Sequence, residues 1–168
     1  YDYIAYLQAQ CGSAIPIHVV TAGKLSDHII DRHIKFSVIP AYYIGGVVGK
    51  RQCTNDFKIV PIKREIQRLR YKRRVKMWIG ISLDEASRMR DSRVKYIENH
   101  YPLIDARMTR HDCMLWLDRH GYEIPPKSAC VYCPYHRDSV WRDIRRKGGE
   151  DWDIVLKVEN ILVNRNGY

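Results

Sequence analysis

The sequence predicts an α/β fold with a doubly wound, mostly parallel sheet. Two short apolar runs rich in β-branched residues, "IPIHVVT" (15–21) and "VKMWIGI" (75–81), are typical of strands buried on both faces. Stretches with helical spacing of apolar residues precede and follow these runs. Because helices that alternate with buried strands connect parallel strands by crossovers, the pattern favours a sheet covered by helices on both faces.

The first expected helices lie in the N-terminal half of the chain. One ends at Gly12, since glycine is suited to a helix stop. A second covers "KLSDHIIDRHIK" (24–35), with Ser26 as the expected N-cap. A third is expected to begin at Pro61, because proline is favoured at the first helical position. Between them, the loop from 36 to 51 holds Tyr42 and Tyr43, which can stack on a base or simply pack.

The C-terminal half predicts three further helices. Thr109 and Asp112 form a capping-box pattern at the start of one, which is expected to stop at Gly121. Two amphipathic stretches, at about 138–147 and 151–163, follow it. "RVKYIENHYPLID" (93–105) is compatible with a strand or with a short helix.

Length and cysteine usage predict a cytoplasmic protein without a membrane partner. The 168 residues amount to about one domain, and no apolar run reaches the roughly 18 residues of a membrane span. The first residues lack the order of a signal peptide. Five cysteines at irregular spacing argue against a disulfide framework, so a close cysteine pair is expected to bind metal or to act in catalysis.

The net charge of +10 is concentrated in one segment. "KREIQRLRYKRRVK" (63–76) holds eight basic residues and one acidic residue, so it carries +7. Such a block suits a polyanion, either a nucleic acid or a phosphorylated small molecule. The alternative is a solvated helix end.

"KSACVYCPYH" (127–136) contains a Cys-x-x-Cys pair, Cys130 and Cys133. Two intervening residues bring the sulfur atoms to the separation that tetrahedral ligation of one metal requires. The pair supplies half of a site, and the remaining ligands can come from Cys53, Cys113 or His136. Zinc and an iron–sulfur cluster both remain open, because both are bound by cysteine thiolates.

Polar residues follow the second predicted strand in "SLDEASRMR" (82–90). Ser82, Asp84, Glu85 and Arg88 are candidates for a ligand site, because ligands in open α/β sheets bind beyond the carboxyl ends of the strands. The alternative is a polar turn that caps a helix.

Four segments in a fixed order carry a resemblance to a known family. They are "RQCTNDFKIVPIKREI", "VKMWIGISLDEASR", "YPLIDARMTRHDCMLWLDRHGY" and "SACVYCPYH". Together they resemble the C-terminal two thirds of the adenylyl-sulfate and phosphoadenylyl-sulfate (PAPS) reductase family of the PP-loop superfamily. The chain looks most like reductase-like proteins of phages and bacteria with "RQCT-x-x-[FY]-K-I" and "PPKSAC-x-x-CP".

The resemblance covers residues 1–136 and leaves 137–168 as a helical C-terminal extension. It implies that Cys53, Cys130 and Cys133 hold a 4Fe-4S cluster near ATP or an adenylylated nucleotide, in the cytoplasm of a bacterial cell or a phage-infected host. With this resemblance the expected catalytic residues are Lys58 and Asp84. Arg64, together with Ser82 and Arg88 from their position after the predicted strand, is expected to bind the nucleotide.

The number of cluster ligands stays open. Thr54 stands where the cluster-bearing reductases have a second adjacent cysteine. Cys113, which is expected to face inward with Trp116 and Leu117, can supply the fourth ligand. Alternatively, three cysteines hold a cluster with one open iron, as in related tRNA-thiolating enzymes, where that iron can bind sulfur.

The expected activity departs from sulfate reduction. Ser82 and Leu83 replace arginines with which the reductases bind phosphosulfate, and no cysteine follows Cys133 to attack sulfur. The sequence therefore predicts a PAPS-reductase-like iron–sulfur enzyme, a sulfurtransferase or oxidoreductase. It would transfer sulfur to, or otherwise modify, a nucleotide or a nucleic acid such as DNA or tRNA that binds residues 63–76. The alternatives are a non-enzymatic zinc protein that binds nucleic acid and an authentic reductase.

The superfamily's phosphate-binding loop, "S-G-G-x-D-S", has no counterpart in this sequence. The resemblance puts that loop upstream of Tyr1, so we expect a fragment, or a chain that cleaves ATP inefficiently. Both monomers and oligomers are compatible with the sequence.

Overall fold

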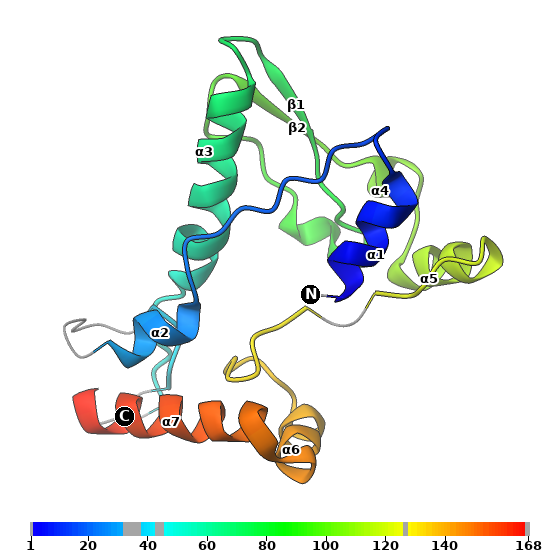
Figure 1. The fold of residues 1–168 in the computed structure, drawn as a ribbon. Coiled ribbons are helices and arrows are strands. Elements are labelled where there is room, and N and C mark those ends of the chain that lie inside the picture. The colour runs from blue at the N-terminus through cyan, green and yellow to red at the C-terminus, as the bar shows by residue number, and fades with distance from the viewer. Residues whose placement is uncertain (1, 32–37, 43–45, 126–127, 167–168) are drawn as a thin grey trace. The chain divides into compact units, whose positions relative to one another are not determined.

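A computed structural model describes residues 2–31, 38–42, 46–125 and 128–166 of the chain (Figure 1). The chain divides into two compact units, each built from two separate segments. The sheet unit comprises Tyr1–Pro16 and Ile66–Lys127. The cysteine unit comprises Ile17–Glu65 and Ser128–Tyr168.

The sheet unit contains two parallel strands, β1 (Val75–Trp78) and β2 (Ile97–His100). Val75 lies opposite Ile97, and Trp78 lies opposite His100. The strand predicted within 75–81 is confirmed, and the ambiguous stretch 93–105 contains a strand followed by a helix, α4 (Pro102–Asp105). Mixed helices and parallel strands agree with an α/β fold.

Burial on both faces of β1 was predicted and is wrong. Val75 and Met77 are half-buried, whereas Lys76 and Trp78 are exposed. Alternation of this kind is typical of a strand with one face toward the protein and one toward solvent.

The helices of the sheet unit end where the sequence predicts. Helix α1 (Asp2–Cys11) stops at Gly12, whose φ of 54° is in the left-handed region that glycine tolerates. Helix α5 (Arg110–Arg119) begins with the predicted capping box, in which Thr109 and Asp112 exchange hydrogen bonds. A 3₁₀ segment, η2 (Leu83–Arg88), lies between the strands.

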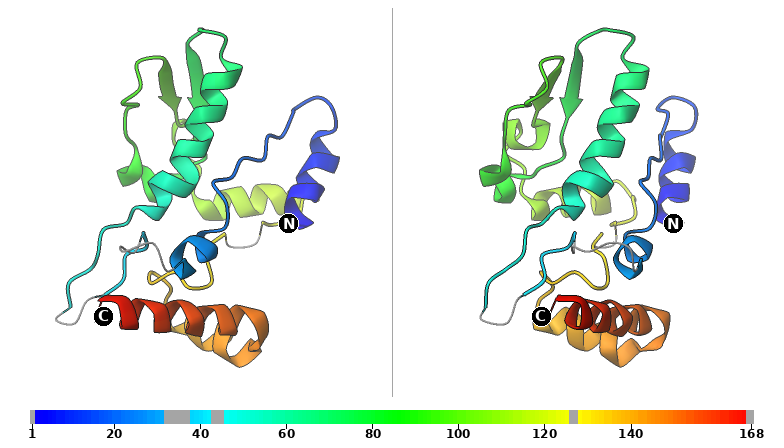
Figure 2. Two further views of the ribbon diagram at one scale, coloured as in Figure 1. Left: turned by 60° about the vertical axis from the view of Figure 1, so that its left-hand side comes forward. Right: turned by 90° about the vertical axis from the view of Figure 1, so that its left-hand side faces the viewer.

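The cysteine unit is mainly helical. Its helices include α2 (Leu25–Ile30), α6 (Asp138–Lys147) and α7 (Gly149–Asn166). The two C-terminal helices confirm the amphipathic stretches predicted there. Figure 2 shows α6 beside α7, and α2 also packs against α7. None of the helices in the described ranges is both long and apolar enough for a membrane crossing.

A small apolar core holds the cysteine unit together. Its buried residues are Ile29, Val38, Ile39 and Val158. Half-buried side chains pack around them, among them Cys53, Phe57 and Tyr132. The core therefore joins α2 and α7 to the segments that carry two parts of the predicted metal site.

Three local predictions are wrong. Residues 15–21 form no strand, and the exposed Ile15 and Val19 show that this apolar run is not buried. Lys24, not Ser26, precedes α2, and no side chain caps that helix. The remainder of the helix predicted over 24–35, residues 32–35, lies outside the described ranges.

The third error concerns Pro61, which was expected to begin a helix. Helical backbone already starts at Cys53 and continues through a π-helical turn, η1 (Asn55–Ile59), into α3 (Val60–Leu69). A proline inside a regular α-helix clashes with the carbonyl four residues earlier. The wider π turn directly before Pro61 offers a physical reason why the helix tolerates it.

Replacement of Val158 by alanine should lower the free energy of unfolding by about 2 kcal/mol. Val158 is only 2% exposed, so the lost methyl groups leave unfilled space in the core. Leu156→Ala is the matched control, because Leu156 is in the same helix but 45% exposed. In urea denaturation, Leu156→Ala should lower the free energy of unfolding by less than about 1 kcal/mol. Equal losses in the two variants would contradict the assignment of Val158 to the core.

Candidate functional site

The Cys-x-x-Cys pair lies in two consecutive turns of the cysteine unit. The Cys133 backbone N–H donates to the Cys130 carbonyl oxygen at 2.9 Å, and His136 N–H donates to the Cys133 carbonyl at 3.1 Å. His136 Nε2 lies 2.8 Å from the Cys130 carbonyl oxygen. A carbonyl only accepts, so Nε2 is the protonated ring nitrogen in this arrangement and only Nδ1 keeps a free lone pair. Cys130 is exposed and Cys133 half-buried.

Cys53 is held in the same unit by its own backbone. The N–H groups of Gln52 and Cys53 both donate to the Val38 carbonyl oxygen, at 3.0 and 2.8 Å. These two hydrogen bonds to one carbonyl oxygen anchor the start of the helical segment that leads into α3. The Cys53 side chain is half-buried against the apolar core.

Tyr132 is affected by two of the candidate ligands, Cys130 and Cys53. Its pKa is raised, first by burial, then by the charge on Cys130, a hydrogen bond with Cys130, and the charges on Cys53 and Asp27. The phenol therefore stays neutral near physiological pH and keeps its hydrogen-bonding proton. Tyr132 is a candidate functional residue that the sequence analysis did not identify. Its location inside "CVYC" was the only available signal.

The side chains of the cysteine unit meet part of what a metal site requires. Thiols are suitable ligands for iron–sulfur clusters and zinc, and Cys53, Cys130 and Cys133 belong to one unit. Thr54 Oγ1, next to Cys53, is buried and has no hydrogen-bond partner among the described residues. Within the described ranges, however, no three His, Cys, Asp or Glu side chains converge closely enough to hold a metal ion. The donor chemistry fits a metal, while the thiols as placed do not form a closed site.

Cys113 belongs to the sheet unit. It is half-buried on α5 together with Leu117, as expected, whereas Trp116 is 47% exposed and stacks on His120 and Tyr122. The inward face predicted for α5 is therefore correct for Cys113 and Leu117 but not for Trp116.

The residues after β1 form a hydrogen-bonded turn. Ser82 is buried, and its hydroxyl lies 3.3 Å from Asp84 Oδ2. Asp84 also accepts the Arg110 backbone N–H at 2.5 Å, and that group is at the exposed start of α5. Arg88 pairs with Glu85 on the same 3₁₀ turn. These contacts agree with the helix-capping alternative for the turn, and they occupy Asp84 and Arg88 with partners of their own.

Lys58 and Arg64, which were expected near a nucleotide, are exposed on consecutive helical segments. Lys58 lies within the π-helical turn that begins just after Cys53 and Thr54, so it is close to Cys53 along the chain. Arg64 lies on α3 and forms no side-chain hydrogen bond or ion pair with a described residue.

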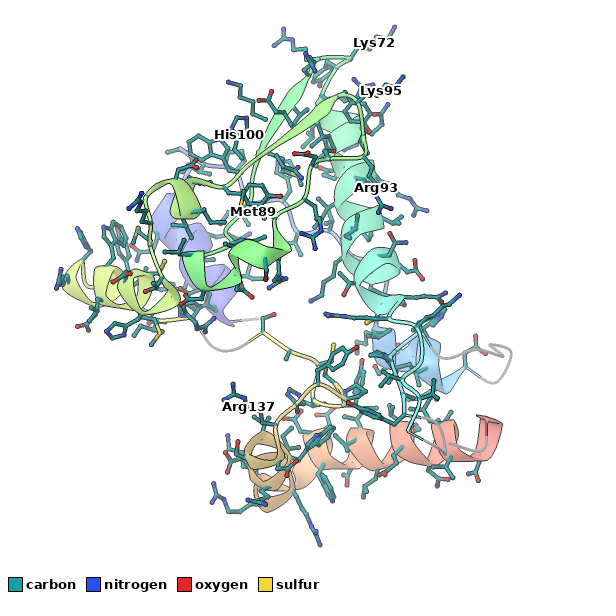
Figure 3. The ribbon with its side chains drawn as sticks, turned by 180° about the vertical axis from the view of Figure 1, so that it is seen from behind. Lys72, Met89, Arg93, Lys95, His100 and Arg137 are labelled. Carbon is teal, nitrogen blue, oxygen red and sulfur yellow. The ribbon has the colours of Figure 1, made fainter. Side chains whose placement is uncertain are left out.

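The basic residues of 70–76 gather at the start of the two strands. Arg70 lies over the Tyr96 ring at 3.8 Å and donates to Gln67, so it joins α3 to the strand region. Figure 3 shows Lys72 and Lys95 at the same end of the strands. We call this surface the basic end; it comprises Lys72, Arg73, Arg74, Lys76, Arg93 and Lys95.

None of the six cations of the basic end forms an ion pair with a described residue. Tyr71, which is 84% exposed, lies directly beside them in the sequence. A surface of free cations with an exposed ring is suited to phosphates and a stacked base.

Comparisons of the chain with models of protein families, with curated proteins and with solved structures found no match.

Proposed function

We propose that this chain belongs to a PAPS-reductase-like iron–sulfur protein that transfers sulfur to a nucleotide, free or within a nucleic acid. The observation that carries the proposal is that Cys53 and Tyr132, which lies between Cys130 and Cys133, pack against one apolar core although they come from the two separate segments of the cysteine unit. Cys133 is fixed to Cys130 by a turn. In this proposal the three thiols hold the cluster, with Cys113 as a candidate fourth ligand, and β1 and β2 are part of a doubly wound sheet.

The unpartnered Thr54 hydroxyl and the basic end give independent support. A buried hydroxyl without a partner is uncommon, and the Thr54 hydroxyl, which has none in the described part of the chain, lies beside a proposed ligand. The free cations of the basic end would neutralise phosphates of a nucleic acid. Lys58 and Arg64 would contact the phosphates of ATP or an adenylylated nucleotide.

The reaction class balances without a reductant. ATP adenylylates a carbonyl oxygen of the base, and pyrophosphate leaves. Sulfur at the oxidation level of sulfide then attacks the same carbon, AMP departs with the oxygen, and a thiocarbonyl group remains. A bound cluster would supply a place to hold that sulfur. The residues of this chain would bind the phosphates, position the base and protect the site from water.

The test is metal analysis of the protein purified without oxygen. We expect a brown protein with broad absorption at about 400 nm and about four iron and four sulfide per chain. Iron, sulfide and zinc are measured on the same sample. A colourless protein with stoichiometric zinc and no iron would contradict the proposal and favour the non-enzymatic zinc protein instead.

A further inference from the structure

A cavity of about 590 Å³ lies within the cysteine unit, apart from the cysteine thiols themselves. The segment 39–42, the Cys-x-x-Cys turn, α6 and α7 line it. Its volume is within the range of about 300–1,000 Å³ that small-molecule sites have. Most of its lining comes from 137–168, the part of the chain outside the family resemblance.

Aromatic rings form much of the wall. Tyr42, Tyr132, Trp141 and Trp152 all line the cavity, and Val155 and Val158 contribute apolar side chains. Trp141 is also oriented by an edge-to-face contact with His136, at 5.3 Å between ring centroids. Aromatic walls of this kind stack on planar rings, and a nucleobase presents such a ring whatever its identity.

Two arginines of α6, Arg142 and Arg145, also line the cavity. Their spacing of three residues puts them on the same face of the helix. Neither has an ion pair or hydrogen bond with a described residue, whereas Arg146, on the same helix, is bonded to Asp143. Two free guanidinium groups at an aromatic cavity favour an anion with several oxygens, such as a phosphate.

The aromatic rings and the two arginines together indicate the class of ligand that the cavity binds. A purely apolar ligand would leave both arginines unused, and an inorganic phosphate would leave the aromatic walls unused. Glu159, the one acidic side chain among the described lining residues, can accept hydrogen bonds from ribose hydroxyls or a base amino group. We infer that this cavity binds a nucleotide, with the base between the aromatic rings and the phosphate on Arg142 and Arg145.

The position of the cavity gives this nucleotide a role. Tyr132 and Pro134, which flank Cys133 in the sequence, are part of the lining. A nucleotide bound there lies against the Cys-x-x-Cys turn, so it is the acceptor of the proposed sulfur transfer. The assignment as acceptor rests on the proposed function, whereas the binding itself does not.

Calorimetric titration of the full chain tests the inference. The probes are AMP and UMP, the matching nucleosides, and single-stranded hexamers of the same two nucleotides. We expect nucleotide binding at least tenfold tighter than nucleoside binding, and the double variant Arg142→Gln, Arg145→Gln should remove this advantage. The matched control, Arg146→Gln with Lys147→Gln, removes the same charge from the same helix outside the cavity and should bind as the unmodified protein does.

Each outcome decides a separate point. Binding of the mononucleotides identifies a free nucleotide as sufficient, and binding of the hexamers alone identifies a nucleic acid as the source. No binding of either, equal affinity for nucleosides, or an equal loss in the control variant overturns the inference. Iron is measured on the same samples: nucleotide binding without iron contradicts the proposed function alone, and iron without nucleotide binding contradicts the cavity assignment alone.

Discussion

Serine in place of Cys53, Cys130 or Cys133 should each reduce the iron content of anaerobically purified protein at least tenfold. The physical reason is that a serine hydroxyl does not provide the soft thiolate that iron–sulfur clusters require. Cys130→Ser is the cleanest of the three, because Cys130 is exposed and its replacement leaves the core intact. Iron and sulfide content and the absorption at about 400 nm are the measurements.

Two further cysteines serve as comparisons. Cys11 lies at the end of α1 and is none of the proposed ligands, so Cys11→Ser should retain full iron content. Cys113→Ser decides the ligand number: loss of iron identifies a fourth cysteine ligand, and full retention identifies a three-cysteine site. If Cys130→Ser and Cys133→Ser both retain iron, the proposed centre is wrong.

Neutralisation of three cations at the basic end should weaken binding of a single-stranded oligonucleotide at least tenfold at low salt. The variant combines Arg73→Gln, Arg74→Gln and Lys95→Gln, all exposed and without an ion-pair partner in the described ranges. Each lost phosphate contact should lower the slope of log K against log salt by about 0.7, so the slope should fall by about 2. Filter binding or fluorescence anisotropy at several salt concentrations measures both quantities.

The matched control removes three positive charges elsewhere. Arg146, Lys147 and Lys157 are exposed residues of α6 and α7 in the cysteine unit. If the basic end is the binding surface, the triple glutamine variant of these residues should retain nearly all of the slope. An equal decrease in both variants would mean that only the net charge of +10 attracts the nucleic acid.

The helices show which features can be read from sequence. The capping box at Thr109 and Asp112, the stop at Gly12 and the amphipathic stretches that became α6 and α7 were all predicted correctly. Each depends on residues within a few positions of one another, because helix hydrogen bonds and caps are local.

The strands show the opposite case. The apolar run 15–21 had the composition of a buried strand and forms none, whereas the ambiguous "IENH" became β2. A strand needs a partner that supplies hydrogen bonds from another part of the chain, so composition alone did not select the correct segment. Trp78 is 75% exposed, although its strand was expected to be buried on both faces. Strand β1 pairs with β2, but in the described part of the chain no element covers the face that carries Trp78.

The candidate site divides in the same way. The sequence by itself determined the cysteine spacing, the concentration of charge at 63–76 and the presence of arginines three residues apart on a helix. Only the tertiary structure decided that Tyr132 and Cys53 pack against one core, that Lys72 shares an end of the strands with Lys95, and that aromatic residues line a cavity beside the cysteine turn. These juxtapositions join residues that are separated in the chain. In the cysteine unit they arise from the burial of apolar side chains in one core, and in the sheet unit from the pairing of β1 with β2, and no local pattern specifies either.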